Sequence, residues 1–312
     1  MEIDAQTENV LRWLRQHSGP TVRLGSAEDL RAAFDRVAIH LDPDPPRMAE
    51  TISVSVPGVD RATPSTLFVP DVDDPSGLLV WFHGGGWIRG GLRSHDAVFR
   101  RIAAASGASV LGVGFRLAPE AQFPAQIEDA EATLAWVLEN AGQFGVNDSV
   151  VAIGGDSTGG TLGLVAGMEL SRRGAKAAFQ ILCYPSLGPE IRSESFHDFA
   201  EDFGFSADDL GRSYQLYLDP TQNHADPRIS PLLTPDLHEA IPTAIVVAGF
   251  DPLRDEAIAL AGLLQGSGVE TEVIHEVSLI HGFLQMGGSI DAAKDAIARV
   301  GMVLKRRFRQ AP

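Results

Sequence analysis

The stretch Ser149–Gly160 reads SVVAIGGDSTGG, and the rest of the chain can be placed around it. Residues 150–153 are apolar and largely β-branched, which predicts a strand buried on both faces of a sheet. Residues 161–170 are rich in Leu, Ala and Gly and are expected to form a helix packed on that strand. Between them, residues 155–159 read GDSTG and fit GxSxG, the pattern of a nucleophile elbow. The stretch therefore predicts a sharp strand-to-helix turn centred on Ser157.

In such a turn Ser157 stands at the carboxyl end of the strand with a helix N-terminus behind it. The serine backbone is strained, and glycines at positions 155 and 159 remove the collision that larger residues would cause. Backbone N–H groups at the helix start point at developing negative charge, so the N–H of Thr158 is an expected oxyanion donor. The alternative is a glycine-rich turn whose serine caps a helix. The motif alone does not decide between them, because a chance GxSxG is expected in about one chain in ten of this length.

Asp156 precedes the serine and has two interpretations. It either shapes the elbow by accepting nearby backbone N–H groups or is merely tolerated there. We favour the structural role and do not count this carboxylate as catalytic.

Strand and helix signals alternate on both sides of the elbow. Strands are expected over residues 52–56, 65–69, 78–82, 109–115, 177–184, 243–249 and 271–277, and helices over 97–105, 127–140, 253–265 and 290–308. This alternation predicts an α/β fold with a mostly parallel central sheet flanked by helices. Such sheets bind their ligands beyond the carboxyl ends of the strands.

Two regions depart from the alternation and predict a helical cap. Residues 8–17 and a segment opened by Ser26 have helical patterns before any strand, and residues 195–217 read as two helices, the second beginning at Ser206. The predicted organisation is N-terminal cap helices over 1–45, the first part of the catalytic core over 46–185, inserted cap helices over 186–225 and the second part of the core over 226–312. Both cap parts would roof Ser157.

Composition restricts the partners. The 312 residues are 44% hydrophobic and 21% charged, as in soluble globular proteins, and the formal net charge is −16. We therefore expect neither nucleic acid nor an anionic membrane surface as a partner. Residues 1–10 carry three acidic side chains and no apolar run, and no segment is long enough to span a bilayer, so a cytoplasmic protein without membrane insertion is expected. Cys183 is the only cysteine, which excludes a cysteine-cluster metal site and predicts a buried thiol.

A nucleophilic serine needs a general base and an orienting carboxylate, which in this architecture follow the serine in the order acid, then histidine. Asp251 comes directly after the strand 243–249 and is the expected acid. Asp255 and Glu256 lie one helical turn later and are expected to face a helix N-terminus or solvent.

Five histidines follow the serine, and position separates them. His197, His224 and His238 precede the candidate acid, and His275 falls inside a predicted strand, where its ring would be held in the sheet. His281 follows that strand on a short loop and is the expected general base.

A second glycine-rich segment, residues 83–87, reads HGGGW after the strand 78–82. Consecutive glycines let the backbone approach a substrate and point its amides inward, as in the HGGG oxyanion motif. Gly85 and Gly86 are the expected donors beside Thr158. A phosphate-binding loop is disfavoured, because neither a following Lys-Ser/Thr nor GxGxxG spacing is present.

Four separated segments agree, HGGGW at 83, GDSTGG at 155, DPLRDE at 251 and HGF at 281, and FRLAPE at 115 and FPA at 123 accompany them. With them the chain resembles the bacterial hormone-sensitive-lipase family of α/β-hydrolase carboxylesterases. The resemblance implies a serine carboxylesterase acting on short- to medium-chain acyl or aryl esters, with Ser157, Asp251 and His281 as the triad. It implies a small-molecule ester substrate and no metal or organic cofactor. Two departures are Thr158 and Phe115, where the family commonly has alanine and tyrosine.

Candidate substrate-binding residues are Trp87 beside the glycine loop and, in the cap, Phe203 and Phe205. They suit an acyl or aryl group, but each could equally belong to a packed core. Two other functions stay open: an amide or peptide hydrolase on the same site, and a non-catalytic small-molecule-binding homologue of the fold. The oligomeric state is open too, with a homodimer as one candidate.

Overall fold

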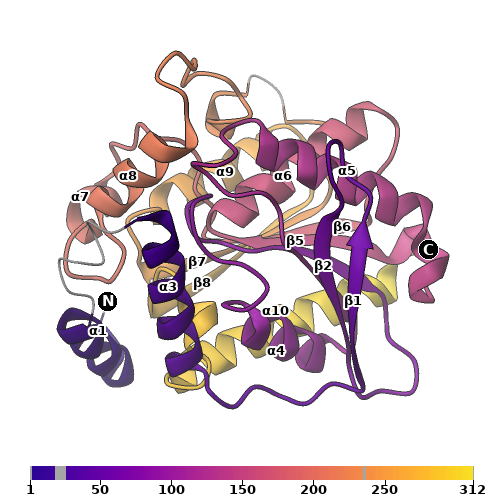
Figure 1. The fold of residues 1–312 in the computed structure, drawn as a ribbon, viewed down its shortest axis with the longest axis horizontal. Coiled ribbons are helices and arrows are strands. Elements are labelled where there is room, and N and C mark those ends of the chain that lie inside the picture. Colours follow the sequence, from indigo (N-terminus) through magenta and orange to yellow (C-terminus); the bar gives the residue numbers. More distant parts are fainter. Residues whose placement is uncertain (1, 18–25, 235–236, 312) are drawn as a thin grey trace.

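The computed structural model describes residues 2–17, 26–234 and 237–311. One eight-stranded sheet runs through these residues in the order β1-β2-β4-β3-β5-β6-β7-β8 (Figure 1). The strands are β1 Glu50–Val56, β2 Thr63–Val69, β3 Leu78–Phe82, β4 Ser109–Val113, β5 Val151–Asp156, β6 Phe179–Cys183, β7 Thr243–Phe250 and β8 Thr271–Ile280. The pairs β1–β2 and β2–β4 are antiparallel, and the other pairs are parallel. The predicted mostly parallel sheet is therefore confirmed.

Helices cover both faces of the sheet. Helices α4 (Asp96–Ser106) and α10 (Asp291–Gln310) pack together against one face, and α5 (Ala125–Glu139), α6 (Thr158–Arg172) and α9 (Arg254–Gly266) cover the other (Figure 1). Every residue of β3, β5, β6 and β7 is buried, as expected for strands packed between two helical layers.

The remaining helices gather beside the carboxyl ends of the strands. They are α1 (Ala5–His17), α3 (Ala27–Leu41), α7 (Glu194–Phe199) and α8 (Ala207–Tyr217), which lie on the left in Figure 1. Capping boxes start α3 at Ser26 and α8 at Ser206, the two start signals read from the sequence. The division into cap segments 1–45 and 186–225 and core segments 46–185 and 226–312 remains a prediction.

Several expected boundaries differ from the structure, and three of the differences bear on the site. Strand β4 ends at Val113, two residues early, because the chain leaves the sheet before Phe115. Helix α6 begins at Thr158 and not at 161, because the elbow turns directly from strand into helix despite the low helix propensity of Gly159 and Gly160. Strand β8 continues to Ile280, so the sheet itself carries the chain up to His281.

Cys183 is buried, as predicted. No helix of the described residues has both the length and the apolar character that crossing a membrane requires.

Candidate active site

Ser157 occupies the turn between β5 and α6. Its φ of 53° and ψ of −122° lie in a region that non-glycine residues rarely adopt, so the expected strain is present. A Cβ at Gly155 would overlap the carbonyl oxygen of Gly159, and one at Gly159 would overlap that of Phe82. The Ser157 N–H donates to the carbonyl oxygen of Cys183 over 2.8 Å. The turn is therefore fixed by its glycines and by a hydrogen bond to the neighbouring strand.

The three residues of the expected triad lie in one hydrogen-bonded chain. Nε2 of His281 is 3.0 Å from Oγ of Ser157, and Nδ1 of His281 is 2.8 Å from Oδ2 of Asp251. Asp251 is fully buried, and its Oδ1 accepts the N–H of Leu253 over 2.8 Å. With Nδ1 donating to the carboxylate, Nε2 is left to accept a proton from the serine. The structure thus brings together three side chains that the sequence separates by up to 124 positions.

Two aromatic rings enclose the His281 imidazole. Phe205, from the segment before α8, stacks on it with ring centroids 4.5 Å apart and an angle of 25°. Tyr184 packs edge-on at 4.9 Å and 60°, and its hydroxyl accepts the N–H of Leu284. Burial raises the pKa of Tyr184 well above its ordinary value, so this phenol stays neutral. Phe205 therefore contacts the general-base candidate itself, and its substrate-binding role stays a prediction.

The glycine loop lies directly against the elbow. A Cβ at Gly84 would be 2.5 Å from Oδ2 of Asp156 and 3.2 Å from Cβ of Ser157. Gly85 and Gly86 have φ of 124° and 68°, which the absence of a side chain permits. The N–H of Gly86 donates to Oγ1 of Thr158 over 3.1 Å. The loop and the helix start expected to form an oxyanion hole are thus in contact.

Helix α8, part of the predicted cap, also touches the glycine loop. A Cβ at Gly86 would lie 2.9 Å from Cβ of Ser213, whose hydroxyl donates to the backbone oxygen of Asp209 over 2.8 Å. Position 86 therefore has no room for a side chain, and α8 packs directly against this part of the loop.

Asp156 has a structural environment, but its partners are side chains and not the expected backbone N–H groups. Its Oδ1 accepts Nε1–H of Trp81 over 3.0 Å, and Oδ2 lies 3.3 Å from Nε2 of His95. Burial alone would raise the pKa of this carboxyl, but the charge of His95 and the hydrogen bonds from His95 and Trp81 lower it below its ordinary value. The carboxylate next to the nucleophile thus stays ionised and tied to the sheet.

His83, the first residue of the HGGGW segment, is buried and uncharged. Its ring stacks on Phe115 with centroids 4.2 Å apart, and Nδ1 lies 2.8 Å from the carbonyl oxygen of Gly84. Burial, helped by the nearby charge of His95, lowers the pKa of His83 from 6.5 to about 3. Neutral Nδ1 can therefore donate to the glycine loop at neutral pH.

This burial predicts acid sensitivity. In the unfolded chain His83 binds a proton below its ordinary pKa of 6.5. In the folded protein it stays unprotonated down to about pH 3. The unfolded state thus binds more protons, so stability falls as pH is lowered through this window. Between about pH 6.5 and about pH 4.5, His83 should lower the free energy of unfolding by about 2 kcal/mol, as measured by urea unfolding at both pH values.

A His83→Gln variant should lose less stability over the same pH step, because glutamine keeps a donor for Gly84 without titrating. His197→Gln is the matched control, since the His197 side chain is 90% exposed. Equal pH dependence in the wild type and the His83 variant would contradict the prediction.

The other two candidate substrate-binding residues lie in packed aromatic groups. Trp87 is buried and stacks parallel to Tyr217 at 4.2 Å, with Tyr214 at 4.9 Å. Phe203 stacks on Phe250 at 5.6 Å. These contacts do not bring either ring against the triad, and their substrate-binding role stays a prediction.

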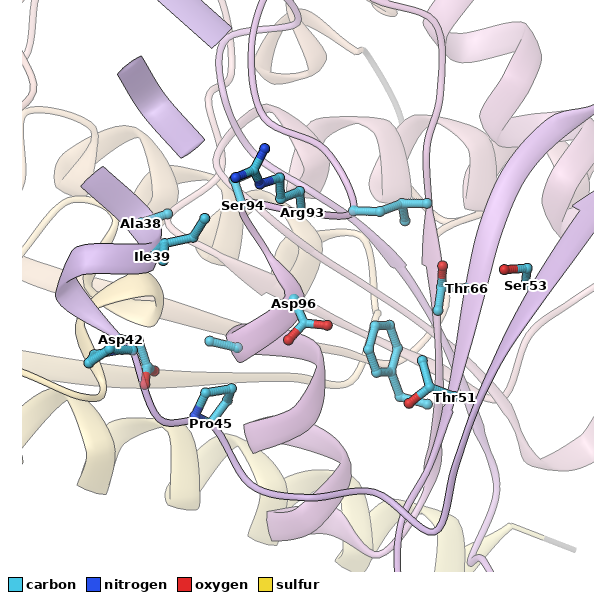
Figure 2. Close-up of a pocket in the computed structure, with 14 residues that line it drawn as sticks. Ala38, Ile39, Asp42, Pro45, Thr51, Ser53, Thr66, Arg93, Ser94 and Asp96 are labelled. Carbon is cyan, nitrogen blue, oxygen red and sulfur yellow. The ribbon is translucent and has the colours of Figure 1, made fainter. Parts of the chain in front are cut away.

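A cavity of about 570 Å³ lies elsewhere (Figure 2). Its lining comes from the end of α3, from β1 and β2 and from the start of α4, and includes Ile39, Thr51 and Asp96. It contains none of the predicted site residues, so it is not the place where Ser157 would meet a substrate. Among the described residues, no group of three or more His, Cys, Asp or Glu side chains could hold a metal ion.

The sequence indicated the candidate site residues, but it did not indicate the side chains that contact them. It assigned no role to His95, Tyr184 or Ser213, which contact Asp156, His281 and Gly86 respectively. His95 had a weak signal, as a histidine between Ser94 and Asp96 at a helix start. His275 was expected to be held in the sheet, but β8 is an edge strand and its side chain is exposed.

Comparison with known proteins identifies the class. Residues 79–285 match the family described as alpha/beta hydrolase fold. The chain therefore belongs to the α/β-hydrolase family, which confirms the predicted fold.

Its relatives narrow the class further. The chain is 36% identical over 276 residues to carboxylic ester hydrolase LipN of Mycobacterium tuberculosis, covering 85% of this chain and 73% of the relative. It is 32% identical over 250 residues to ethyl acetate hydrolase of Pseudomonas putida, covering 78% of this chain and 79% of the relative. A solved ester hydrolase from the metagenome of Lake Arreo has a TM-score of 0.94 at 29% identity, covering 98% of this chain and 99% of that one. The predicted resemblance to bacterial hormone-sensitive-lipase family carboxylesterases is confirmed.

Proposed function

We propose that this enzyme hydrolyses short- to medium-chain acyl or aryl esters with Ser157 as nucleophile, His281 as general base and Asp251 as the orienting acid. The chain is a carboxylic ester hydrolase, as its relatives are. The observation that carries the assignment of roles is the hydrogen-bonded chain from Asp251 through His281 to Ser157, at 2.8 and 3.0 Å.

In the first half of the reaction, Oγ of Ser157 forms a bond to the ester carbonyl carbon while Nε2 of His281 takes the hydroxyl proton. The carbonyl electron pair moves onto oxygen and gives a tetrahedral oxyanion. When the intermediate collapses, the bond to the alcohol oxygen breaks and His281 protonates the leaving alcohol. Asp251 keeps the imidazole in the required tautomer and stabilises the imidazolium.

The second half releases the acid. Water gives a proton to Nε2 of His281 and adds to the acyl carbon, and a second oxyanion forms. Its collapse breaks the bond to Oγ of Ser157, which regains a proton from His281, and the carboxylic acid leaves. The backbone N–H groups of Gly85, Gly86 and Thr158 are the proposed donors to both oxyanions, each typically contributing about a hundredfold or more in rate.

Covalent labelling tests the nucleophile. A fluorophosphonate should label the wild-type protein at one site, and Ser157→Ala should abolish labelling, because the reagent phosphonylates an activated serine. Labelling retained in the alanine variant would overturn the role of Ser157. A protein that never reacts would support the alternative of a non-catalytic binding homologue, which the relatives do not favour.

Substrate length and bond type need a second experiment. Along a series of p-nitrophenyl esters from acetate to palmitate, kcat/KM should be highest among the short and medium chains, because the aromatic side chains around the site are packed. Palmitate as the best substrate would contradict this. A matched anilide should be hydrolysed far more slowly than its ester, and the reverse order would favour an amide hydrolase.

Cytoplasmic location and a homodimer remain predictions.

A further inference from the structure

Thr158 places a hydroxyl where the proposed oxyanion would bind. Its backbone N–H is one of the three expected donors, and its Oγ1 accepts the N–H of a second, Gly86, over 3.1 Å. The residue is only 2% exposed. In the absence of a substrate, the threonine oxygen therefore occupies the hydrogen-bonding position that an oxyanion would take on Gly86.

The Thr158 hydroxyl acts as an acceptor toward Gly86, so its own O–H proton is not used in that hydrogen bond. A threonine O–H supplies one proton and accepts through two lone pairs. Oγ1 accepts from Gly86, and no described residue accepts its proton in return. A buried O–H without an acceptor costs free energy, and an anion arriving beside it would satisfy it.

Gly86 is closely packed on the side that faces α8. Its Cα faces Ser213 of α8, close enough that a Cβ there would lie 2.9 Å from the Ser213 Cβ. The amide is thus held between the cap helix and the start of α6. A substrate oxygen that binds this amide would share the donor with Thr158 Oγ1, which places the threonine hydroxyl next to that oxygen.

We infer that the Thr158 hydroxyl is a catalytic donor: it holds the Gly86 amide in the resting enzyme and donates its proton in a hydrogen bond to the tetrahedral oxyanion. No covalent bond changes, since the proton stays on Oγ1. The hydrogen bond is charge-assisted and forms only when the carbonyl oxygen becomes anionic, so it lowers the barrier more than it strengthens ester binding. This inference rests on the proposed ester hydrolysis at Ser157.

Three variants test it. Thr158→Val keeps the branched shape and removes the hydroxyl, Thr158→Ala removes both, and Thr158→Ser keeps the hydroxyl. On p-nitrophenyl butyrate, the valine and alanine variants should lose about tenfold to a hundredfold in kcat with KM little changed, and serine should stay within a few-fold of wild type. Circular dichroism establishes that each variant is folded, and the alanine variant suffices if valine fails to fold.

A transition-state analogue separates oxyanion binding from loop packing. An aryl trifluoromethyl ketone adds Ser157 Oγ to its carbonyl and forms a stable oxyanion, so its inhibition constant should rise in Thr158→Val by the same factor as kcat/KM falls. Valine or alanine variants as active as wild type, or a serine variant as impaired as valine, would overturn the inference. An inactive wild-type protein would overturn the proposed function instead, so the two failures are distinguishable.

Discussion

Replacing Ser157 by alanine should lower kcat on p-nitrophenyl butyrate by about a millionfold while leaving the fold intact. The hydroxyl oxygen is the atom expected to bond to the acyl carbon, and it lies 3.0 Å from Nε2 of His281. The residual rate would come from binding and from the oxyanion amides. Stopped assays with concentrated enzyme and a circular dichroism spectrum measure both halves of the expectation.

The matched control is Ser55→Ala, which removes an exposed serine hydroxyl from edge strand β1. This variant should keep wild-type kinetics. If Ser157→Ala retained substantial turnover of the ester, the nucleophile would have to be sought elsewhere.

His281→Ala should cost nearly as much, about a millionfold in kcat. Without the imidazole, Ser157 loses the base 3.0 Å away, and buried Asp251 loses its donor at Oδ2 and keeps the Leu253 N–H at Oδ1. His275→Ala serves as the control, because that side chain is exposed on β8. Both variants are measured against the same ester series. Comparable losses at the two positions would exclude His281 as the specific base.

The sequence predicted the parts of this site that depend on strand order. Ser157 and Asp251 directly follow the buried strands β5 and β7, and His281 directly follows the edge strand β8. These strands are parallel, so their carboxyl ends lie at one edge of the sheet. A periodicity of apolar residues is enough to place such positions. The same reasoning failed at the start of α6, where turn geometry outweighs the low helix propensity of two glycines.

Side-chain partners across the cap could not be read in this way. Phe205 over His281 and Ser213 against Gly86 depend on how α8 and the segment before it settle on the core. Trp87 and Phe203 carry the same apolar signal as Phe205, yet their rings pack against Tyr217 and Phe250. The apolar character of an aromatic side chain predicts that its ring will be buried. Which residues pack against the ring depends on the tertiary structure.

The close fit of Ser213 against Gly86 limits how this enzyme can be re-engineered. Enlarging the side chain at position 213 to reshape the substrate entrance would push on the peptide unit that is proposed to hold the oxyanion. Substrate preference and turnover are therefore not independently adjustable at this contact. A mutant library aimed at new acyl groups should leave position 213 small and vary residues that do not bear on the glycine loop.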